Sequence, residues 1–449
     1  MKKKETIKVG IGFATGRKSF QKVLKSNICN WKKSGLVDNA NISLNLFISY
    51  DLNYNNTDKM DYINLDPEIS ENIDDAVFIG TEEWKQEIQS LINENIIDPS
   101  EAEKIHRAGY ASQRNAVLYY AIKNKMDYLI FFDDDEYQMA VTNTSLGETW
   151  GGQNVLSTHL EHLRHADFTH GHHCGYISPI PFIEYNNTMT EMDFRSFIEA
   201  ISNDILNWDN IKTVMNNGGV TYANPSILVS EIPTEVPEIN HAKFISGANL
   251  GINLTDPRKI LPFYNPIGAR GEDTFLSTCL SERKVLKVPC YTFHDGFSNY
   301  LDLLDGVLPI KLKFIKADNE QILQRFYNAC IGWIRYKPLL MYITKPDCYE
   351  AKIEEMRQKL SAILPKICEY FDKADFMNVL DELEKYNKNV KNHYQEFVET
   401  QFTWGKMMEY LYSQDIEEYE PSSFAYANKQ KIYIPAGMNL VSLKMKQLV

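Results

Sequence analysis

The first part of the chain alternates short apolar runs with segments of helical periodicity. Strands are predicted over residues 7–13 and 42–50, where apolar side chains follow one another closely. Between them, apolar residues recur at the spacing of one helical face: Phe20, Val23, Leu24 and Ile28. Further helices are predicted over residues 84–97 and 109–126. This alternation of strand and helix predicts a parallel, doubly wound α/β sheet.

A third apolar run, over residues 128–132, ends in four consecutive carboxylates: Asp133, Asp134, Asp135 and Glu136. A run of this kind is typical of a strand buried on both faces in the middle of an α/β sheet. Open α/β sheets bind ligands beyond the carboxyl ends of their strands. Adjacent acids at such a position are costly unless a positive charge lies beside them. The pattern therefore indicates a ligand site at residues 133–136.

Beyond residue 150 the pattern loosens, and residues 151–245 are interpreted as an insertion. The insertion contains a histidine-rich strand, an acidic helix and a loop rich in Pro and Glu, predicted over 168–180, 192–205 and 232–239. Strands resume at 244–252 and 285–293.

After about residue 305 the chain is predicted to be helical, because apolar residues form two stripes at helical spacing. One stripe precedes Pro365 and the other follows it: Ile353, Met356, Leu360 and Ile363, then Phe376, Val379, Leu380 and Leu383. We place a domain boundary between 300 and 310. This boundary predicts two domains: an α/β domain over residues 1–304 and an α-helical C-terminal domain over residues 305–449.

The composition, with 44% hydrophobic and 24% charged residues, is that of a soluble globular protein. A net charge of −13 argues against a general nucleic-acid or anionic-membrane binder. The seven cysteines form no CxxC pair, which favours reduced thiols. Neither a signal peptide nor a transmembrane segment is predicted, so a cytoplasmic location is expected. The content of Asn, Lys and Ile suggests a bacterial or phage origin.

A hard divalent cation is the counter-charge that best suits the acidic cluster at residues 133–136. Mg²⁺ and Mn²⁺ accept carboxylate oxygens as ligands and keep coordination positions for phosphate oxygens. An acidic protein binds a diphosphate through such a metal, so the net charge does not oppose this hypothesis. The sequence therefore predicts a metal that holds a diphosphate.

Six segments stand in a characteristic order: KVGIGFATGRKSFQKVLKSNI, LFISYDLNYNNTD, AGYASQRNAVLYYAIKNKMDYLIFFDDDE, FISGANLGINL, GARGEDTFLSTCL and FHDG. Together they resemble the GT-A glycosyltransferases, especially the large inverting group called family 2. The third segment is similar to that family's Gly-x-x-x-Ala-Arg-Asn helix and Asp-x-Asp strand, with Gln113 in place of Ala. In the second segment, Asn and Tyr replace the usual Asp-Gly-Ser-Thr-Asp loop. The resemblance covers about residues 5–300 and implies a Rossmann-like, mostly parallel sheet flanked by helices.

The resemblance also implies residue roles. The donor-binding positions are Phe13, Ala14, Thr15, Arg17, Asp51, Arg114, Asp133, Asp134, Gly247, Ala248 and Asn249. The metal site for Mn²⁺ or Mg²⁺ consists of Asp133, Asp135 and His294, with Asp135 as the direct ligand. Asp133 also reaches the ribose or base side of the donor. Asp273 is the general base that activates the acceptor hydroxyl, and Glu272 makes a donor or acceptor contact.

Six histidines precede Cys174: His159, His162, His165, His170, His172 and His173. Neutral imidazoles and a thiolate suit zinc. Along a strand, however, His170 and His172 face one side and His173 faces the other. We therefore expect one face of this strand to line the acceptor cleft, with a zinc site as the alternative. Three aromatic residues are expected in the core, with sugar stacking as their alternative role: Trp150, Tyr176 and Trp208.

The sequence thus predicts a metal-dependent glycosyltransferase that moves a sugar from a nucleoside diphosphate to a hydroxyl of a glycan, protein or small molecule, with inversion. A UDP-sugar is the expected donor and a GDP-sugar the alternative, and no nucleic-acid partner is expected. Residues 151–245 then form an acceptor-side insertion, and the helical domain shapes the acceptor site or mediates homo-oligomerisation.

Three alternatives stay open: a retaining GT-A glycosyltransferase, a nucleotidyltransferase and a non-catalytic nucleotide-sugar-binding protein. A nucleotidyltransferase is expected to carry a Gly-rich basic loop after its first strand, which residues 15–18 match only in part.

Overall fold

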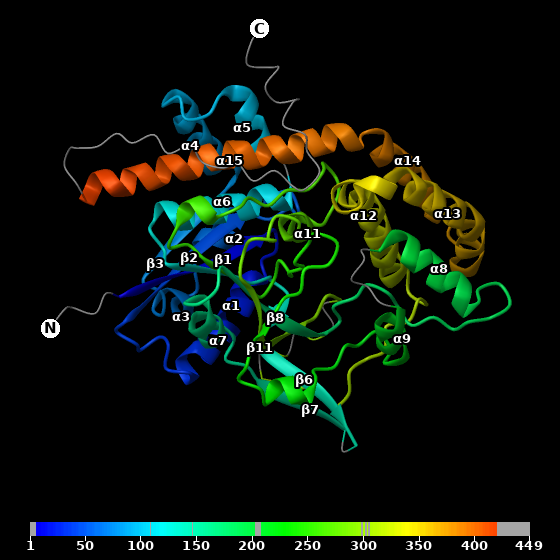
Figure 1. The fold of residues 1–449 in the computed structure, drawn as a ribbon. Helices are drawn as coiled ribbons and strands as arrows, with labels where there is room; N and C mark the ends of the chain where they lie inside the picture. The colour runs from blue at the N-terminus through cyan, green and yellow to red at the C-terminus, as the bar shows by residue number, and fades with distance from the viewer. Residues whose placement is uncertain are drawn as a thin grey trace, which may run out of the picture.

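The computed structural model describes residues 6–107, 109–145, 147–202, 208–297, 300, 303 and 306–419. A large sheet forms the centre of the molecule, helices cover both of its faces, and a group of long helices extends to one side (Figure 1). Residues 420–449 of the predicted helical domain lie outside the described residues. In the described part of the chain, no helix is both long enough and apolar enough to span a bilayer.

Four parallel strands make up one half of the sheet, in the order β3, β2, β1 and β4. Their bounds are Asp75–Ile79, Ile42–Tyr50, Ile7–Thr15 and Tyr128–Phe131. The other half continues with β10, β8, β11 and β5, and the short β9 pairs with β11. These strands span Leu250–Asn253, Phe168–Gly175, Val285–His294, Glu136–Tyr137 and Thr234–Glu235.

The second half of the sheet is mixed. Strand β10 is antiparallel to both β4 and β8, β11 is parallel to β8, and β5 is antiparallel to β11. The prediction of a mostly parallel sheet is therefore confirmed for the first half, whereas the second half is partly antiparallel. An apolar run shows that a strand is buried, but it has the same appearance whether the neighbouring strand is parallel or antiparallel.

Strand β4 is buried on both faces, as its uninterrupted apolar run predicts. Leu129 and Phe131 belong to the core beneath α4, α5 and α6, whereas Ile130 and the following Phe132 belong to the core beneath α1 and α7. Those helices span Thr81–Asn93, Pro99–Ile105, Tyr110–Lys123, Phe20–Lys33 and Val155–Leu163. Alternate side chains of β4 therefore enter two separate cores.

The helices and strands predicted in the first 130 residues lie close to their predicted places, whereas β3 and α5 were not predicted. The strand at 42–50 is confirmed at both ends, and the first strand runs two residues beyond its prediction, to Thr15. The helix predicted over 84–97 is α4, which begins earlier because the Gly80 amide donates to the Glu83 side chain in a capping arrangement. It also ends earlier, at Asn93. Two short helices, α2 (Met60–Ile63) and α3 (Pro67–Ser70), follow β2.

Between residues 151 and 252 the structure differs from its predicted pattern at the ends of two strands. The strand predicted over 168–180 ends at Gly175, where a φ of +84° and a backbone pairing with Thr221 turn the chain. The strand predicted over 244–252 begins only at Leu250, because Asn249 adopts a left-handed φ of +50°. The helix predicted over 192–205 is α8 (Glu191–Ile201), and residues 203–207 lie outside the described residues.

The other elements of this region are short. Strands β6 and β7 form a separate hairpin, α9 and α10 follow α8, and α11 follows β10. Their bounds are Met139–Thr144, Gly147–Gly152, Trp208–Asn216, Pro225–Leu228 and Glu272–Ser277.

The C-terminal region is helical, as predicted, and consists of α12, α13, α14 and α15. These helices span Glu320–Thr344, Tyr349–Phe371, Asn378–Lys388 and Val390–Tyr419. Helix α13 continues through Pro365, whose exposed ring leaves the Ser361 carbonyl open to water. Phe194 and Phe197 of α8 pack in the same core as Phe326 of α12, so the insertion and the C-terminal helices share one hydrophobic cluster.

Helix α15 joins the helical region to the α/β part by packing against α5 and against the turn at Pro257–Lys259 (Figure 1). Trp404 and Met407 are buried in the core beneath α6, and the indole N–H of Trp404 donates a 3.1 Å hydrogen bond to the Ile260 carbonyl. Lys406 forms a 2.6 Å ion pair with Glu101 of α5. The predicted boundary between 300 and 310 includes residues outside the described ones.

Candidate functional site

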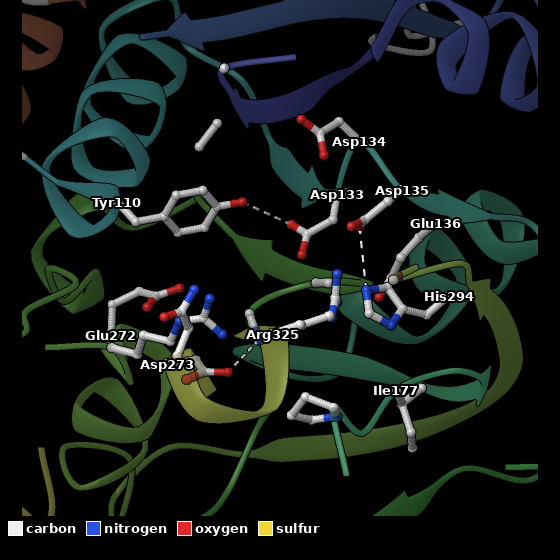
Figure 2. A pocket seen from close by; sticks show the side chains of 18 of the residues that line it. Tyr110, Asp133, Asp134, Asp135, Glu136, Ile177, Glu272, Asp273, His294 and Arg325 are labelled. Atoms are coloured by element: carbon white, nitrogen blue, oxygen red, sulfur yellow. Dashed lines mark hydrogen bonds and ion pairs between the residues drawn. The ribbon is translucent and has the colours of Figure 1, made fainter. Parts of the chain in front are cut away.

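A cavity of about 1380 Å³ lies where β1 and β4 end, and α12 forms one of its walls. Figure 2 shows residues 133–136 on one side of it and Glu272 and Asp273 on another. Thirteen of the fifteen residues proposed from the sequence line this cavity: Ala14, Thr15, Arg17, Asp51, Arg114, Asp133, Asp134, Asp135, Gly247, Ala248, Glu272, Asp273 and His294. The tertiary structure thus gathers nearly all of the predicted residues in one place.

Phe13 and Asn249 are the two proposed donor-binding residues that do not line the cavity. Phe13 is fully buried and packs its ring against Phe20 and Phe132. The Asn249 amide is also fully buried, and its oxygen lies 2.7 Å from Nε2 of His159. The side chains of both residues support the strands around the site and face away from a ligand.

Arg114 is the buried cation of the site, with 1% of its surface exposed. Its Nη2 lies 3.0 Å from Oδ1 of Asp133, and its Nη1 donates a 2.6 Å hydrogen bond to the Gly247 carbonyl. The Tyr110 ring lies 4.9 Å from the guanidinium, and its hydroxyl is 3.3 Å from the same Asp133 oxygen. Burial raises the pKa of Asp133 to about 7, against the opposing effect of the Arg114 charge.

Arg17 bridges the next two carboxylates. Its Nη1 lies 2.7 Å from Oδ1 of Asp134 and 2.6 Å from Oδ2 of Asp135. The turn after β1 holds it there, because the Arg17 amide donates to Oγ1 of Thr15, and that hydroxyl also donates to Asp134. Burial lowers the pKa of Arg17, but the two carboxylates outweigh burial and raise it above its ordinary value.

His294, at the end of β11, faces Asp135. The distance from Nε2 to Oδ1 of Asp135 is 3.4 Å, and Nδ1 donates a 2.7 Å hydrogen bond to the Tyr176 carbonyl. Burial alone lowers the pKa of His294, but the Asp135 carboxylate raises it to about 9. Burial raises the pKa of Asp135, but His294 and Arg17 together hold it well below its usual range. The two side chains therefore form a charged pair at neutral pH.

Glu136 is 5% exposed and anchors the end of the acidic cluster. Oγ1 of Thr292 donates a 2.7 Å hydrogen bond to it, and Nδ1 of His173 lies 3.1 Å from its other oxygen. Burial raises the pKa of Glu136, but the interactions with His173, His294 and Thr292 together outweigh burial, and the pKa falls below its ordinary value. This arrangement fixes the backbone that carries Asp135.

Asp273 lies in the first turn of α11, which begins after Gly271 with a φ of +90°. One of its oxygens accepts a 3.0 Å hydrogen bond from the Gly247 amide, and the other accepts a 2.7 Å bond from the Thr274 amide. These two hydrogen bonds fix the orientation of the Asp273 carboxylate. Burial and the neighbouring Asp273 charge raise the pKa of Glu272, so the two acids differ in environment.

In the described part of the chain, no group of three or more His, Cys, Asp or Glu side chains is arranged to hold a metal ion. The donor chemistry of the Asp135–His294 pair nevertheless fits a Mn²⁺ or Mg²⁺ site with two protein ligands. A carboxylate oxygen and an imidazole nitrogen suit Mn²⁺ especially, and the other coordination positions are then open to substrate oxygens.

Residues that the sequence analysis did not assign also line the cavity: Tyr110, Glu136, His173, Arg270 and Arg325. Glu136 and His173 belong to clusters noticed in the sequence, but nothing local showed that they meet. Arg325 comes from α12, and the only sequence signal is a charged residue next to the buried Phe326. Tyr110 follows Gly109 inside the family-like helix motif, at a position where the motif specifies no residue type.

The histidine-rich stretch contributes one residue to the cavity, His173. His159 is fully buried, and burial lowers its pKa to about 4. His172 stacks on Tyr291 at 5.1 Å, and burial lowers its pKa to about 4 as well. Of the three aromatic residues, Tyr176 and Trp208 are buried in hydrophobic clusters, and Trp150 packs edge-on against Phe293 at 4.8 Å.

Comparison with known proteins adds no identification: the chain matches no family model and none of the curated proteins. Its function is therefore argued from the geometry of the cavity.

Proposed function

We propose that the protein is a metal-dependent glycosyltransferase that moves a sugar from a nucleoside-diphosphate donor to an acceptor hydroxyl. The observation that carries this proposal is the meeting of three groups in one cavity: the acidic residues after β4, His294 and Asp273. The first two suit a metal diphosphate, and the third suits an acceptor hydroxyl. A cavity of about 1380 Å³ is large enough for a nucleotide-sugar with part of an acceptor.

The donor side is built from fixed charges. In this proposal Asp135 and His294 hold Mn²⁺ or Mg²⁺, which when bound neutralises the negative charge that develops on the departing diphosphate. Arg114 holds Asp133 and the Gly247 carbonyl in place, so that the wall beside the sugar is rigid. Because Gly247 and Ala248 have little or no side chain, the donor approaches the backbone closely there.

The acceptor side depends on Asp273. An acceptor hydroxyl is a weak nucleophile at neutral pH, so a carboxylate must take its proton as it attacks the sugar. Both oxygens of Asp273 already accept a backbone N–H, which orients the carboxylate. Each oxygen retains a second lone pair for the acceptor. The bond from the sugar to the diphosphate breaks as the new bond forms, and inversion is the expected outcome.

The test is a thermal-shift screen of UDP-, GDP-, CDP- and dTDP-sugars with Mn²⁺. Turnover is then measured with the donor that raises the melting temperature of the protein most. Release of a nucleoside diphosphate supports sugar transfer, whereas release of pyrophosphate identifies a nucleotidyltransferase. NMR of the anomeric product separates inversion from retention. Binding without release of any product from any acceptor identifies a non-catalytic binding protein.

A further inference from the structure

Helix α12 of the C-terminal region places one arginine in the cavity whose charge is unpaired. Arg325 is half-buried, and among the described residues it makes no hydrogen bond and no ion pair. Its guanidinium lies over the Phe297 ring at 4.7 Å. An ordinary buried or half-buried arginine is paired, because the loss of hydration must be offset. Arg325 therefore lacks the partner that its position requires.

The guanidinium lies beside the proposed metal ligand His294. A side chain added at Gly296 would contact Nη2 of Arg325, and its first atom would also lie 2.7 Å from Cε1 of His294. Both groups thus border the bare backbone of Gly296. Figure 2 shows the Arg325 side chain reaching toward His294 and the acidic residues after β4.

The charges around Arg325 favour an anion. Burial lowers its pKa, and the like charges of Arg17 and Arg270 lower it further, against the attraction of Asp135. The carboxylate that attracts Arg325 most, Asp135, is already in contact with Arg17 and His294. A cation that is partly desolvated near other cations is stabilised when an anionic ligand enters between them.

We propose that Arg325 binds the diphosphate of the donor, so that the helical C-terminal region completes the donor site. This inference rests on the proposed function. Arg17 contacts Asp135, Asp135 contacts His294, and Arg325 lies beside His294 at Gly296. Two guanidinium groups and a metal-binding pair therefore lie along one wall of the cavity. A guanidinium matches phosphate oxygens with two parallel N–H donors, and it gains strength as charge accumulates on the leaving group.

In the transfer step, the sugar carbon–oxygen bond breaks and its electron pair goes to the terminal diphosphate oxygen. The acceptor oxygen forms the new bond, and its proton goes to Asp273. Arg325 interacts with the oxygen that receives the electron pair, or with its neighbours on the same diphosphate. Its loss therefore lowers the rate of the chemical step as well as donor affinity.

The test uses the full chain with Arg325→Gln and Arg325→Lys, and Arg195→Gln as a charge-matched control. Arg195 lies on α8, is about half exposed and pairs only with Glu199 in the described structure. Calorimetry measures binding of UDP, GDP, CDP, dTDP and inorganic pyrophosphate, each with Mn²⁺. We expect Arg325→Gln to weaken the binding of pyrophosphate, and of the nucleoside diphosphate that binds most tightly, by about 10- to 100-fold. This is the range for a lost charged hydrogen bond. Arg325→Lys should be intermediate, and Arg195→Gln should match the wild type.

The outcomes separate the two proposals. Equal binding of nucleoside diphosphate by wild type and Arg325→Gln, with unchanged circular dichroism, overturns the role of Arg325 and leaves the proposed function standing. If the wild type binds none of the four nucleoside diphosphates, the proposed function fails and this inference fails with it.

Discussion

Nε2 of His294 lies 3.4 Å from Oδ1 of Asp135, although β10 and β8 separate β11 from β4 in the sheet. The chain makes this approach by continuing from β4 into β5, which pairs with β11 and places Glu136 opposite His294. The Asp295 amide donates a 3.0 Å hydrogen bond to the Asp135 carbonyl and so also holds the end of β11 against the segment that leads into β5. The pair is therefore held by backbone pairing and does not depend on a ligand.

Asp135→Ala is expected to abolish Mn²⁺-dependent binding of nucleoside diphosphates. The change removes the carboxylate of a two-ligand site, and a single imidazole does not hold the metal. Electron paramagnetic resonance of Mn²⁺ and a thermal-shift assay with and without the metal measure the effect. Glu199→Ala, which removes an exposed carboxylate on α8, is the control. Metal-dependent stabilisation that persists in Asp135→Ala would contradict the assignment.

Asp273→Asn is expected to retain donor binding and to lower turnover by about 100-fold or more, the scale for a removed general base. An amide side chain accepts only one of the two backbone N–H bonds made to Asp273, so we also expect a loss of about 1 kcal/mol in unfolding free energy. Calorimetry of the donor and single-turnover kinetics separate binding from chemistry. Turnover at the wild-type rate would show that another group takes the proton.

The unfolding free energy is expected to fall as pH rises from about 6.5 to 9, through the titration of His294. Below about pH 6.5 the His294 imidazole is charged in both the folded and the unfolded state, so its contact with Asp135 contributes its full stabilisation to the folded state. Above that pH the unfolded state loses its proton first, whereas the folded pKa is about 9. The stabilisation, up to roughly 3 kcal/mol, is then lost.

Urea unfolding in EDTA at pH 7.5, 8.3 and 9 checks this prediction (roughly the interval between the two pKa values). Working above pH 7 avoids the Asp133 carboxyl, whose folded pKa of about 7 affects stability at lower pH. His294→Gln should show a flatter dependence than the wild type. Parallel curves for the two proteins would mean that His294 does not titrate in this range.

Arg114→Met is expected to reduce the unfolding free energy by about 3–5 kcal/mol, because it leaves Asp133 and the Gly247 carbonyl without their buried partner. Adding Asp133→Asn to that variant should recover part of the loss, since the uncompensated charge is then gone. Denaturant unfolding of the two single variants and the double variant forms a thermodynamic cycle. Strictly additive effects would show that the two residues are not energetically coupled.

Trp404→Ala is expected to reduce the unfolding free energy by about 3–5 kcal/mol, because the buried ring fixes α15 against the core under α6. Phe402→Ala on the same helix is the control, since 47% of that side chain is exposed. We expect far- and near-ultraviolet circular dichroism to change in one transition at a lower denaturant concentration. A separate early transition of the helical region would show that α15 contributes little to the α/β part.

Prediction from the sequence succeeded where one strand or helix carries its own signal. The apolar run before Asp133 and the periodicity around Phe20 report burial directly, so β4 and α1 lie where they were predicted. The direction of β10 was not predictable, because its apolar residues are the same for parallel and antiparallel neighbours. The exclusion of Asn249 from the cavity follows from its left-handed backbone and its contact with His159, neither of which has a local signature.

The sequence by itself determined that a buried strand ends in carboxylates and that their charge needs a counter-charge, because both properties belong to adjacent residues. Only the tertiary structure decided which groups supply that charge. Arg17, Arg114 and His294 come from three other elements, and Arg325 comes from a helix that begins nearly 190 residues later, at Glu320. Their approach depends on how β11 and α12 pack against the sheet, which is a sum of many contacts and not a property of any one segment.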